Sequence, residues 1–248
     1  MKRKRPNRVV VMGASSGIGR LMAMRFVEAG CRVAVAARRL DRLEEIRQMA
    51  PERVLTSEID VTAPDAASKL EALIDSLGGV DLYFHAAGMG FYNPDLDNDK
   101  EMATVATNAE GFTRCVDCVF RRMAANGGGH IAAITSIAQT KGIGMAPSYS
   151  ATKRYQTTYL TALEQLSKIR RLGISFTDIR PGFVNTDFLR GDTYPMLMKP
   201  DFVADKAYKA TIKRRRVATI DWRYRLLVAA WRLLPRPLWV RLNIQNYS

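Results

Sequence analysis

The sequence predicts a doubly wound, three-layer α/β/α fold built on a seven-stranded parallel sheet, and two observations lead to this fold class. Short runs of apolar and β-branched residues alternate along the chain with longer segments of helical periodicity. The short runs are almost continuously apolar, which is typical of parallel strands covered on both faces. Right-handed crossovers between such strands place helices on both sides of the sheet.

The alternation defines each element in order. The expected strands are residues 9–12, 33–37, 54–58, 82–85, 130–135, 174–179 and 217–220. The expected helices lie near residues 17–29, 40–49, 63–77, 99–125, 148–172 and 201–215. No repeat, low-complexity segment or linker interrupts the pattern, so residues 1–220 are expected to form one domain. Residues 221–248 follow the last strand and are expected to form a C-terminal helical extension.

Composition excludes several classes of protein. A chain of 248 residues with 47% hydrophobic and 25% charged residues suits one α/β domain and excludes disordered or fibrous chains. No apolar stretch is long enough to span a bilayer, and the start does not resemble a signal peptide, so a cytoplasmic location is expected. Cys115 and Cys118 form a CxxC pair, but it falls within an expected helix and lacks a second Cys/His pair. No metal site is therefore expected.

The net charge of +14 is concentrated at the two ends of the chain. Residues 2–8 carry +5 and residues 206–248 carry +10, which leaves −1 on residues 9–205. The basic ends contain no nucleic-acid recognition motif and no stacking platform, so nucleic-acid binding is not expected. The body of the chain between them is nearly neutral.

A glycine-rich loop follows the first strand and opens the first helix. Glycines let the backbone turn tightly and approach a pyrophosphate, while the helix N-terminus supplies free N–H groups, as in Rossmann-like dinucleotide sites. A strand-to-helix turn also needs glycine in the absence of any ligand, so the loop alone is weak evidence. The candidate cofactor residues here are Gly13, Ser15, Ser16, Gly17, Ile18 and Gly19.

Two arginines end the second strand, about 20 residues beyond the loop, where NAD-binding folds place an acid on the ribose 2′-hydroxyl. Arg38 and Arg39 would instead attract a 2′-phosphate, which a guanidinium matches in charge and geometry. The pair therefore favours NADP(H) over NAD(H), with Arg38 as the principal contact. Two solvated arginines opening the next helix are the alternative.

A candidate catalytic group follows in the second half of the chain. Ser136 stands at the end of an apolar strand, and Tyr149 and Lys153 are spaced so that they share one face of a helix. A neighbouring ammonium favours the phenolate and lowers the pKa of a tyrosine, so the pair can exchange a proton near neutral pH.

Together these motifs resemble the classical short-chain dehydrogenase/reductase family over roughly residues 8–220. The resemblance implies that Asn108 is a catalytic asparagine. It also places His85-Ala-Ala-Gly88 where Asn-Asn-Ala-Gly is usual, and Met12 where threonine is usual; His85 is expected to be structural. The further cofactor contacts that it implies are Asp60, Val61, Ala87, Gly88, Asn108, Tyr149, Lys153, Pro181, Gly182, Val184 and Thr186.

The resemblance implies a mechanism for a carbonyl reductase or alcohol dehydrogenase. Tyr149 would protonate the carbonyl oxygen as hydride arrives, or deprotonate an alcohol in the reverse direction. Ser136 would bond the same oxygen, Lys153 would bond the nicotinamide ribose, and Asn108 would hold a water that relays protons. A non-catalytic NADP-binding sensor or scaffold is the alternative, although it would have no need of all four residues.

The segments flanking the expected site are apolar and favour a lipid- or steroid-like ketone or aldehyde. Packing of a lid against the body explains the same residues equally well. The candidate substrate contacts are Ser136, Met89, Met145, Phe183, Phe188 and Tyr194.

The extension is expected to begin with a helix over residues 222–234, stopped by Pro235 and Pro237. Its arginines gather near one face, which is typical of a basic amphipathic helix lying on an anionic membrane surface. A helix docked on its own subunit or on a partner is the alternative, so peripheral membrane contact stays open. The family resemblance implies a homodimer or homotetramer formed through the helices near 99–125 and 148–172.

Overall fold

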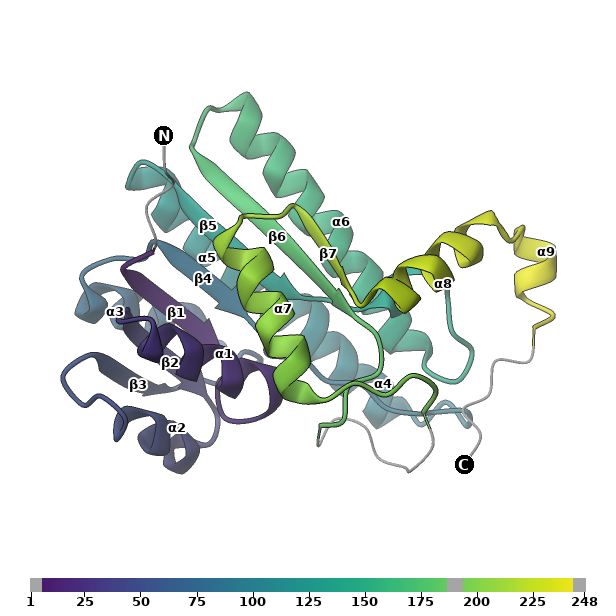
Figure 1. The fold of residues 1–248 in the computed structure, drawn as a ribbon, viewed down its shortest axis with the longest axis horizontal. Coiled ribbons are helices and arrows are strands. Elements are labelled where there is room, and N and C mark those ends of the chain that lie inside the picture. Colours follow the sequence, from purple (N-terminus) through teal and green to yellow (C-terminus); the bar gives the residue numbers. More distant parts are fainter. Residues whose placement is uncertain (1–5, 187–193, 243–248) are drawn as a thin grey trace.

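The computed structural model describes residues 6–186 and 194–242, and within them it confirms the predicted α/β/α fold (Figure 1). Seven parallel strands form one sheet in the order β3-β2-β1-β4-β5-β6-β7. The strands are β1 Arg8–Met12, β2 Arg32–Ala37, β3 Val54–Glu58, β4 Leu82–His85, β5 Gly129–Ile134, β6 Ile174–Pro181 and β7 Val217–Ile220.

Helices cover both faces of this sheet. Apolar side chains of α1, α2, α7 and α8 pack on one face, and those of α3, α5 and α6 pack on the other. The helices are α1 Gly17–Glu28, α2 Leu40–Arg47, α3 Ala66–Leu77, α4 Asn98–Val105, α5 Phe112–Ala125, α6 Pro147–Ile169, α7 Pro200–Ile212, α8 Trp222–Leu233 and α9 Arg236–Trp239.

Alternation of side chains along each strand explains the continuous apolar runs in the sequence. In β1, Val9 and Val11 point into the core beneath α1, whereas Val10 and Met12 point into the core beneath α3 and α5. All four side chains are fully buried. Both faces of the strand are therefore interior, which is the arrangement predicted.

The chain changes direction across the sheet at β1, which lies between β2 and β4. The helices that follow β1 and β4 thus leave on opposite faces, and the region between them, beyond the carboxyl ends of these strands, is called the crevice below. Open α/β sheets bind ligands at such a switch point. The glycine loop and the segment after His85 both begin there.

The helix expected over residues 99–125 is interrupted, and this is a correction to the sequence prediction. Residues Ala106–Gly111 form a π-helical turn between α4 and α5. Gly111 lies so close to the β3–α3 connection that a Cβ there would be 2.8 Å from the carbonyl oxygen of Val61. The side chain of Asn108, also in this turn, is bonded to the backbone of Met89. Helical periodicity alone could not reveal these tertiary contacts.

One other boundary differs from the prediction. The third helix begins at Ala66 rather than near residue 63, because Asp60 accepts hydrogen bonds from the backbone and hydroxyl of Thr62 and holds that segment in a turn. Helix α8 ends at Leu233, just before Pro235, as predicted, and a separate short helix α9, which was not predicted, follows with Pro237 in its first turn.

Candidate active site

The glycine loop brings the end of β1 against the segment that follows β4. Gly13 has φ +84°, and a Cβ there would lie 2.5 Å from the backbone nitrogen of Ala87. Its own N–H donates to the carbonyl of Ala36 at 2.7 Å, which fixes the loop to β2. Only glycine meets both conditions at this position. The N-terminal turn of α1, which includes Gly17, Ile18 and Gly19, opens directly from this loop after Ser16.

The turn after β6 lies opposite the loop. A Cβ on Gly17 would be 3.6 Å from Cγ2 of Thr186, so the two predicted cofactor contacts face each other. Pro181 ends β6, and Val184 forms an isolated β-bridge with Met198, which follows residues 187–193 in the sequence. These residues and the loop thus line one crevice, as a dinucleotide would require.

The arginines at the end of β2 border the same crevice. Arg38 and Arg39 are exposed, and Arg39 Nη2 donates to the hydroxyl of Ser15 at 3.2 Å. Within residues 6–186 and 194–242, neither guanidinium has a carboxylate oxygen within 4.0 Å. Burial alone would raise the pKa of Asp60, but hydrogen bonds from Thr62 and the positive charge of Arg38 hold it below its usual range. The crevice therefore has a basic end.

Ser136 and Tyr149 meet at the carboxyl end of β5. Ser136 follows that strand, and its hydroxyl caps a short 3-10 helix by accepting from the N–H of Ala138 at 3.1 Å. Burial raises the pKa of Tyr149 above its ordinary value, and a side-chain hydrogen bond with Ser136 offsets this only in part, so the lower pKa expected from the neighbouring Lys153 ammonium is not borne out. The two hydroxyls are therefore close enough to bind one oxygen atom.

Lys153 lies one helical turn beyond Tyr149 and is buried. Its Nζ is 5.7 Å from the centroid of the Tyr149 ring and donates to the carbonyl of Ile134 at 3.2 Å. A second bond of 3.0 Å goes to Oε1 of Gln156. Burial lowers the pKa of Lys153 to about 8, and the carboxylate of Asp178 opposes this shift. The ammonium is thus partly deprotonated just above neutral pH.

Asn108 joins this group from the π-helical turn. Its amide accepts from the N–H of Met89 at 2.8 Å and donates to the carbonyl of Met89 at 2.6 Å, which fixes the segment after β4. A Cβ on Gly88 would lie 3.4 Å from Nζ of Lys153 and 3.5 Å from Oδ1 of Asn108. The predicted catalytic residues are therefore assembled around the segment Ala87–Met89.

His85 is fully buried beside this group. Its Nδ1 lies 2.8 Å from the hydroxyl of Tyr83, and its ring packs edge-on against Phe112 with centroids 5.0 Å apart. Burial, together with the charge of Lys153, lowers the pKa of His85 to about 3. It therefore stays neutral at physiological pH and supplies no proton there.

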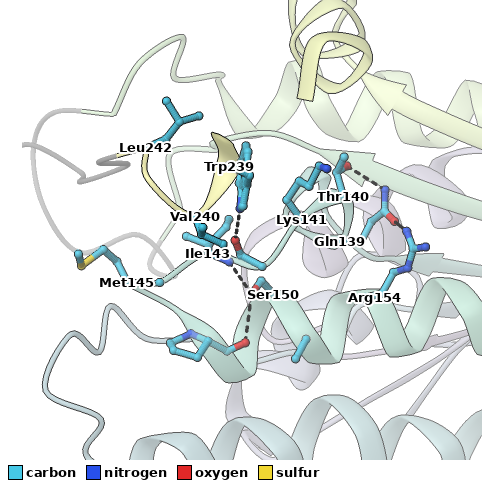
Figure 2. Close-up of a pocket in the computed structure, with 14 residues that line it drawn as sticks. Gln139, Thr140, Lys141, Ile143, Met145, Ser150, Arg154, Trp239, Val240 and Leu242 are labelled. Atoms are coloured by element: carbon cyan, nitrogen blue, oxygen red, sulfur yellow. Dashed lines mark hydrogen bonds between the residues drawn. The ribbon is translucent and has the colours of Figure 1, made fainter. Parts of the chain in front are cut away.

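A pocket of about 610 Å³ lies on the α9 side of the segment that joins Ser136 to α6. Ile143 and Met145 from that segment and Trp239, Val240 and Leu242 line the pocket, and Figure 2 shows Ile143 beside Val240. Of the predicted substrate contacts, Met145 lines this pocket, whereas Ser136 and Tyr149 do not. The contribution of α9 was missed from the sequence, because nothing local to residues 236–242 indicates what they pack against.

The other predicted substrate contacts lie around the crevice. Met89 and Phe183 are half-buried, and the Phe183 ring is 4.9 Å from that of Tyr194 between centroids. Phe188 lies outside the described residues. Gln156 was also missed, although its spacing of three residues from Lys153 places both on one helix face and was a usable signal.

Comparisons with known proteins agree with this geometry. The model of the short chain dehydrogenase family matches residues 7–194. An uncharacterized oxidoreductase of Myxococcus xanthus is 30% identical over 237 residues, which cover 92% of this chain and 93% of the relative. This chain therefore belongs to the short-chain dehydrogenase family, as its sequence motifs indicated.

Solved structures show the same fold. A Sinorhizobium meliloti 1021 protein assigned as a short-chain alcohol dehydrogenase superposes with a TM-score of 0.79 at 26% identity, covering 89% of this chain and 96% of that one. A single-residue variant of actinorhodin polyketide ketoreductase, solved with NADPH, has a TM-score of 0.74 at 25% identity, covering 86% and 95%. The chain is an oxidoreductase of a family that uses a nicotinamide cofactor.

Proposed function

We propose that this protein is an NADPH-dependent carbonyl reductase, reversible as an alcohol dehydrogenase, that acts on an apolar ketone or aldehyde. The observation that carries the proposal is the convergence of Ser136 and Lys153 on Tyr149 at the mouth of the glycine-loop crevice. Proton transfer to a carbonyl needs a donor, a second group that fixes the oxygen, and a charge that tunes the donor. Each is present.

The residues of the crevice fit a nicotinamide dinucleotide. Gly13 lets the glycine loop pack directly against the backbone of Ala87, where a Cβ would collide, and α1 begins straight after this loop, so its N-terminal N–H groups are available to a pyrophosphate. Arg38, with no carboxylate partner in the described chain, supports NADP(H) over NAD(H) because it can bind a 2′-phosphate. When bound, the reduced cofactor supplies the hydride.

The chain's own residues perform the remaining steps. Ser136 donates a hydrogen bond to the substrate oxygen and orients the carbonyl. Tyr149 gives its phenolic proton to that oxygen in reduction and takes it back in oxidation. The ammonium of Lys153, with Nζ 5.7 Å from the centroid of the Tyr149 ring, stabilises the phenolate left behind.

The substrate proposal rests on the apolar surroundings of the site. Met89 and Phe183 border the crevice, and the pocket beyond Met145 is lined mainly by apolar side chains. Such walls favour a bulky apolar substrate of lipid or steroid type, with few polar groups to fix its orientation.

Turnover tests the assignment of Tyr149. We expect Tyr149→Phe to retain NADPH binding, measured by cofactor fluorescence, and to lose at least about a hundredfold in kcat, since general acid catalysis contributes on that order. Tyr155→Phe is the matched control, because its hydroxyl bonds Thr113 on α5 at 2.6 Å. NADPH oxidation is followed across steroids, acyl ketones and small aldehydes. Full activity of Tyr149→Phe would refute the mechanism.

A substitution at Arg38 tests the cofactor proposal. Arg38→Asp removes the 2′-phosphate contact and adds repulsion, so we expect NADPH affinity to fall at least about tenfold relative to NADH. Arg32→Asp at the start of the same strand is the control and should leave the preference unchanged. An unchanged ratio in Arg38→Asp would overturn the proposal for NADP(H).

A non-catalytic NADP-binding sensor or scaffold is the second candidate, and the same assays distinguish it. Such a protein would bind NADPH through Arg38 but oxidise it with none of the carbonyl compounds. The buried ammonium of Lys153 beside Tyr149 favours the enzyme, because a binding protein gains nothing from a costly buried charge there.

We further propose that the protein is cytoplasmic and that its helices α8 and α9 contact an anionic membrane surface. Among the described residues no helix is long and apolar enough to cross a bilayer. Helices α8 and α9 lie at one end of the molecule (Figure 1). On α8, Trp222 is 61% and Leu233 84% exposed, and Arg225 and Arg232 are exposed as well. This combination favours interfacial binding, although other side chains of α8 pack on the body.

Sedimentation with anionic vesicles tests this surface. We expect Arg225→Glu with Arg232→Glu to abolish binding at low salt, because each arginine contributes about 1 kcal/mol near such a surface. Arg121→Glu on α5 is the control. Binding that survives the double substitution would refute the membrane proposal.

The oligomer that the family resemblance implies is a separate proposal. Sedimentation equilibrium tests it, and the mass of a dimer or tetramer is the expected result.

A further inference from the structure

Gln156 is a buried polar residue to which the mechanism above gives no role. It lies on α6, three residues after Lys153, and its side chain is fully buried. A buried primary amide is costly unless its donors and acceptor are bonded. Both ends of this amide are used, and both lead to residues of the candidate active site.

The two hydrogen bonds of Gln156 form a bridge. Its Oε1 accepts from Nζ of Lys153 at 3.0 Å, and its Nε2 donates to the backbone carbonyl of Asn108 at 2.9 Å. Chemistry fixes the orientation of the amide, because an ammonium can only donate and a carbonyl can only accept. The bridge ties α6 to the π-helical turn that holds Asn108.

We propose that Gln156 is a positioning residue of this active site, whose amide clamps the Lys153 ammonium to the carbonyl of Asn108 and so holds it against Tyr149. An amide N–H does not ionise near neutral pH, so this bridge fixes a position and carries no proton. The family resemblance implied a proton-relaying water at Asn108, and Gln156 bonds the backbone carbonyl of the same residue.

The charged groups around Lys153 define what the bridge can change. Tyr149 lies on the same helix, His85 faces it from β4, and Asp178 faces it from β6. Of these only Asp178 is negative, and it forms its ion pair with Arg180 at 2.6 Å. The nearest acceptors of Lys153 are thus two neutral carbonyl oxygens, of Ile134 and of Gln156. Removing one destabilises the charged amine, and a carboxylate in its place stabilises it.

The decisive experiment titrates Lys153 in the cofactor-free protein. Lysine labelled with carbon-13 at Cε gives a resonance for Lys153, assigned by its loss in Lys153→Met. The wild-type midpoint is expected at about 8. Gln156→Met, which keeps the length of the side chain, should lower that midpoint by about one pH unit, and Gln156→Glu should raise it by about one.

Thr157→Val is the matched control. Thr157 is the next residue of α6, is buried, and has a hydroxyl with no hydrogen-bond partner within the described residues. The midpoint of Lys153 should stay within about 0.3 pH units of wild type in this variant, because surrounding packing changes but no bond to Lys153 is lost. Equal midpoints in all variants, or shifts of the same sign in Gln156→Met and Gln156→Glu, would overturn the proposal.

A second measurement distinguishes failure of the Gln156 clamp from failure of the proposed function. The effect of the clamp on catalysis rests on that function. In steady-state reduction, we expect Gln156→Met to lower kcat about tenfold with little change in the KM for the carbonyl substrate. If the wild-type protein reduces nothing, the proposed function fails while the titration still tests the clamp. If wild type turns over and Gln156→Met matches it in kcat, the clamp is refuted even where the protein folds normally.

Discussion

The hydroxyl of Tyr224 should contribute to the free energy of unfolding by holding segments outside its own helix, and Tyr224→Phe isolates this contribution. Tyr224 is fully buried on α8, accepts from the N–H of Phe183 at 3.1 Å, and lies 3.0 Å from the carbonyl of Pro195 and 3.1 Å from that of Met196. It therefore joins both flanks of residues 187–193 to the body. The phenylalanine variant keeps the ring and removes only these bonds.

The size of the effect follows from the number of bonds. The single O–H proton is shared between the two carbonyls, so the variant loses two hydrogen bonds, at a cost of about 1–3 kcal/mol. The part-buried N–H of Phe183 is left without its acceptor, which keeps the total near the upper end. We expect a loss of about 2–3 kcal/mol in the free energy of unfolding. For a chain of this length that lowers Tm by roughly 5–10 °C.

Urea unfolding followed by far-UV circular dichroism measures this loss. Tyr92→Phe is the control, because Tyr92 is 51% exposed and water can replace its bonds. NADPH affinity should also fall, since Phe183 directly follows the turn predicted to contact the cofactor. If Tyr224→Phe were within about 0.5 kcal/mol of Tyr92→Phe, the hydroxyl would not hold these segments in solution and the reasoning would fail.

Two further predictions concern the crevice. Gly13→Ala should abolish NADPH binding and destabilise the fold more than Gly30→Ala, because both glycines have positive φ (+84° and +83°) but only Gly13 of the two lacks room for a Cβ. Urea unfolding measures both variants, and equal losses would remove the argument that Gly13 packs closely against the backbone of Ala87. His85→Asn should reduce the loss of unfolding free energy that the wild type shows between about pH 6.5 and about pH 4.5. In the folded protein the pKa of His85 is about 3, so over this range it takes up a proton only in the unfolded chain, and this costs wild type about 2 kcal/mol by about pH 4.5. Unfolding free energies at those two pH values check this, and an identical pH dependence in the variant would show that His85 is not buried and neutral.

Local patterns predicted the sheet well. Continuous apolar runs located the seven strands to within about two residues, because parallel strands buried on both faces leave a signal that does not depend on neighbours. The glycine loop, Arg38 and the Tyr149–Lys153 pair were predicted for a similar reason: the pattern of each depends on residues close together in the sequence. The structure then brings these separate segments to one edge of the sheet.

Long-range contacts explain what the sequence could not reveal. The π-helical turn at Asn108 depends on Met89 and on the close approach of Gly111 to Val61. In the extension, α8 buries Tyr224 and Val228 against the body and leaves Leu226 and Leu233 exposed, and the contacts that decide this lie outside the helix. The indole of Trp239 bonds the carbonyl of Gly142, almost a hundred residues away, at 2.8 Å. No window of local sequence contains such partners.

Gly182 and the Tyr224 ring occupy neighbouring space, since a Cβ on Gly182 would overlap the ring. The turn predicted to lie beside the nicotinamide is therefore shaped in part by a residue of the C-terminal extension. A larger residue at 182 is tolerable only with a smaller one at 224, so in related chains the two positions should change together. The extension would then be inherited with the active site as one unit, and exchanging it between relatives should succeed only when the residue at 182 is exchanged with it.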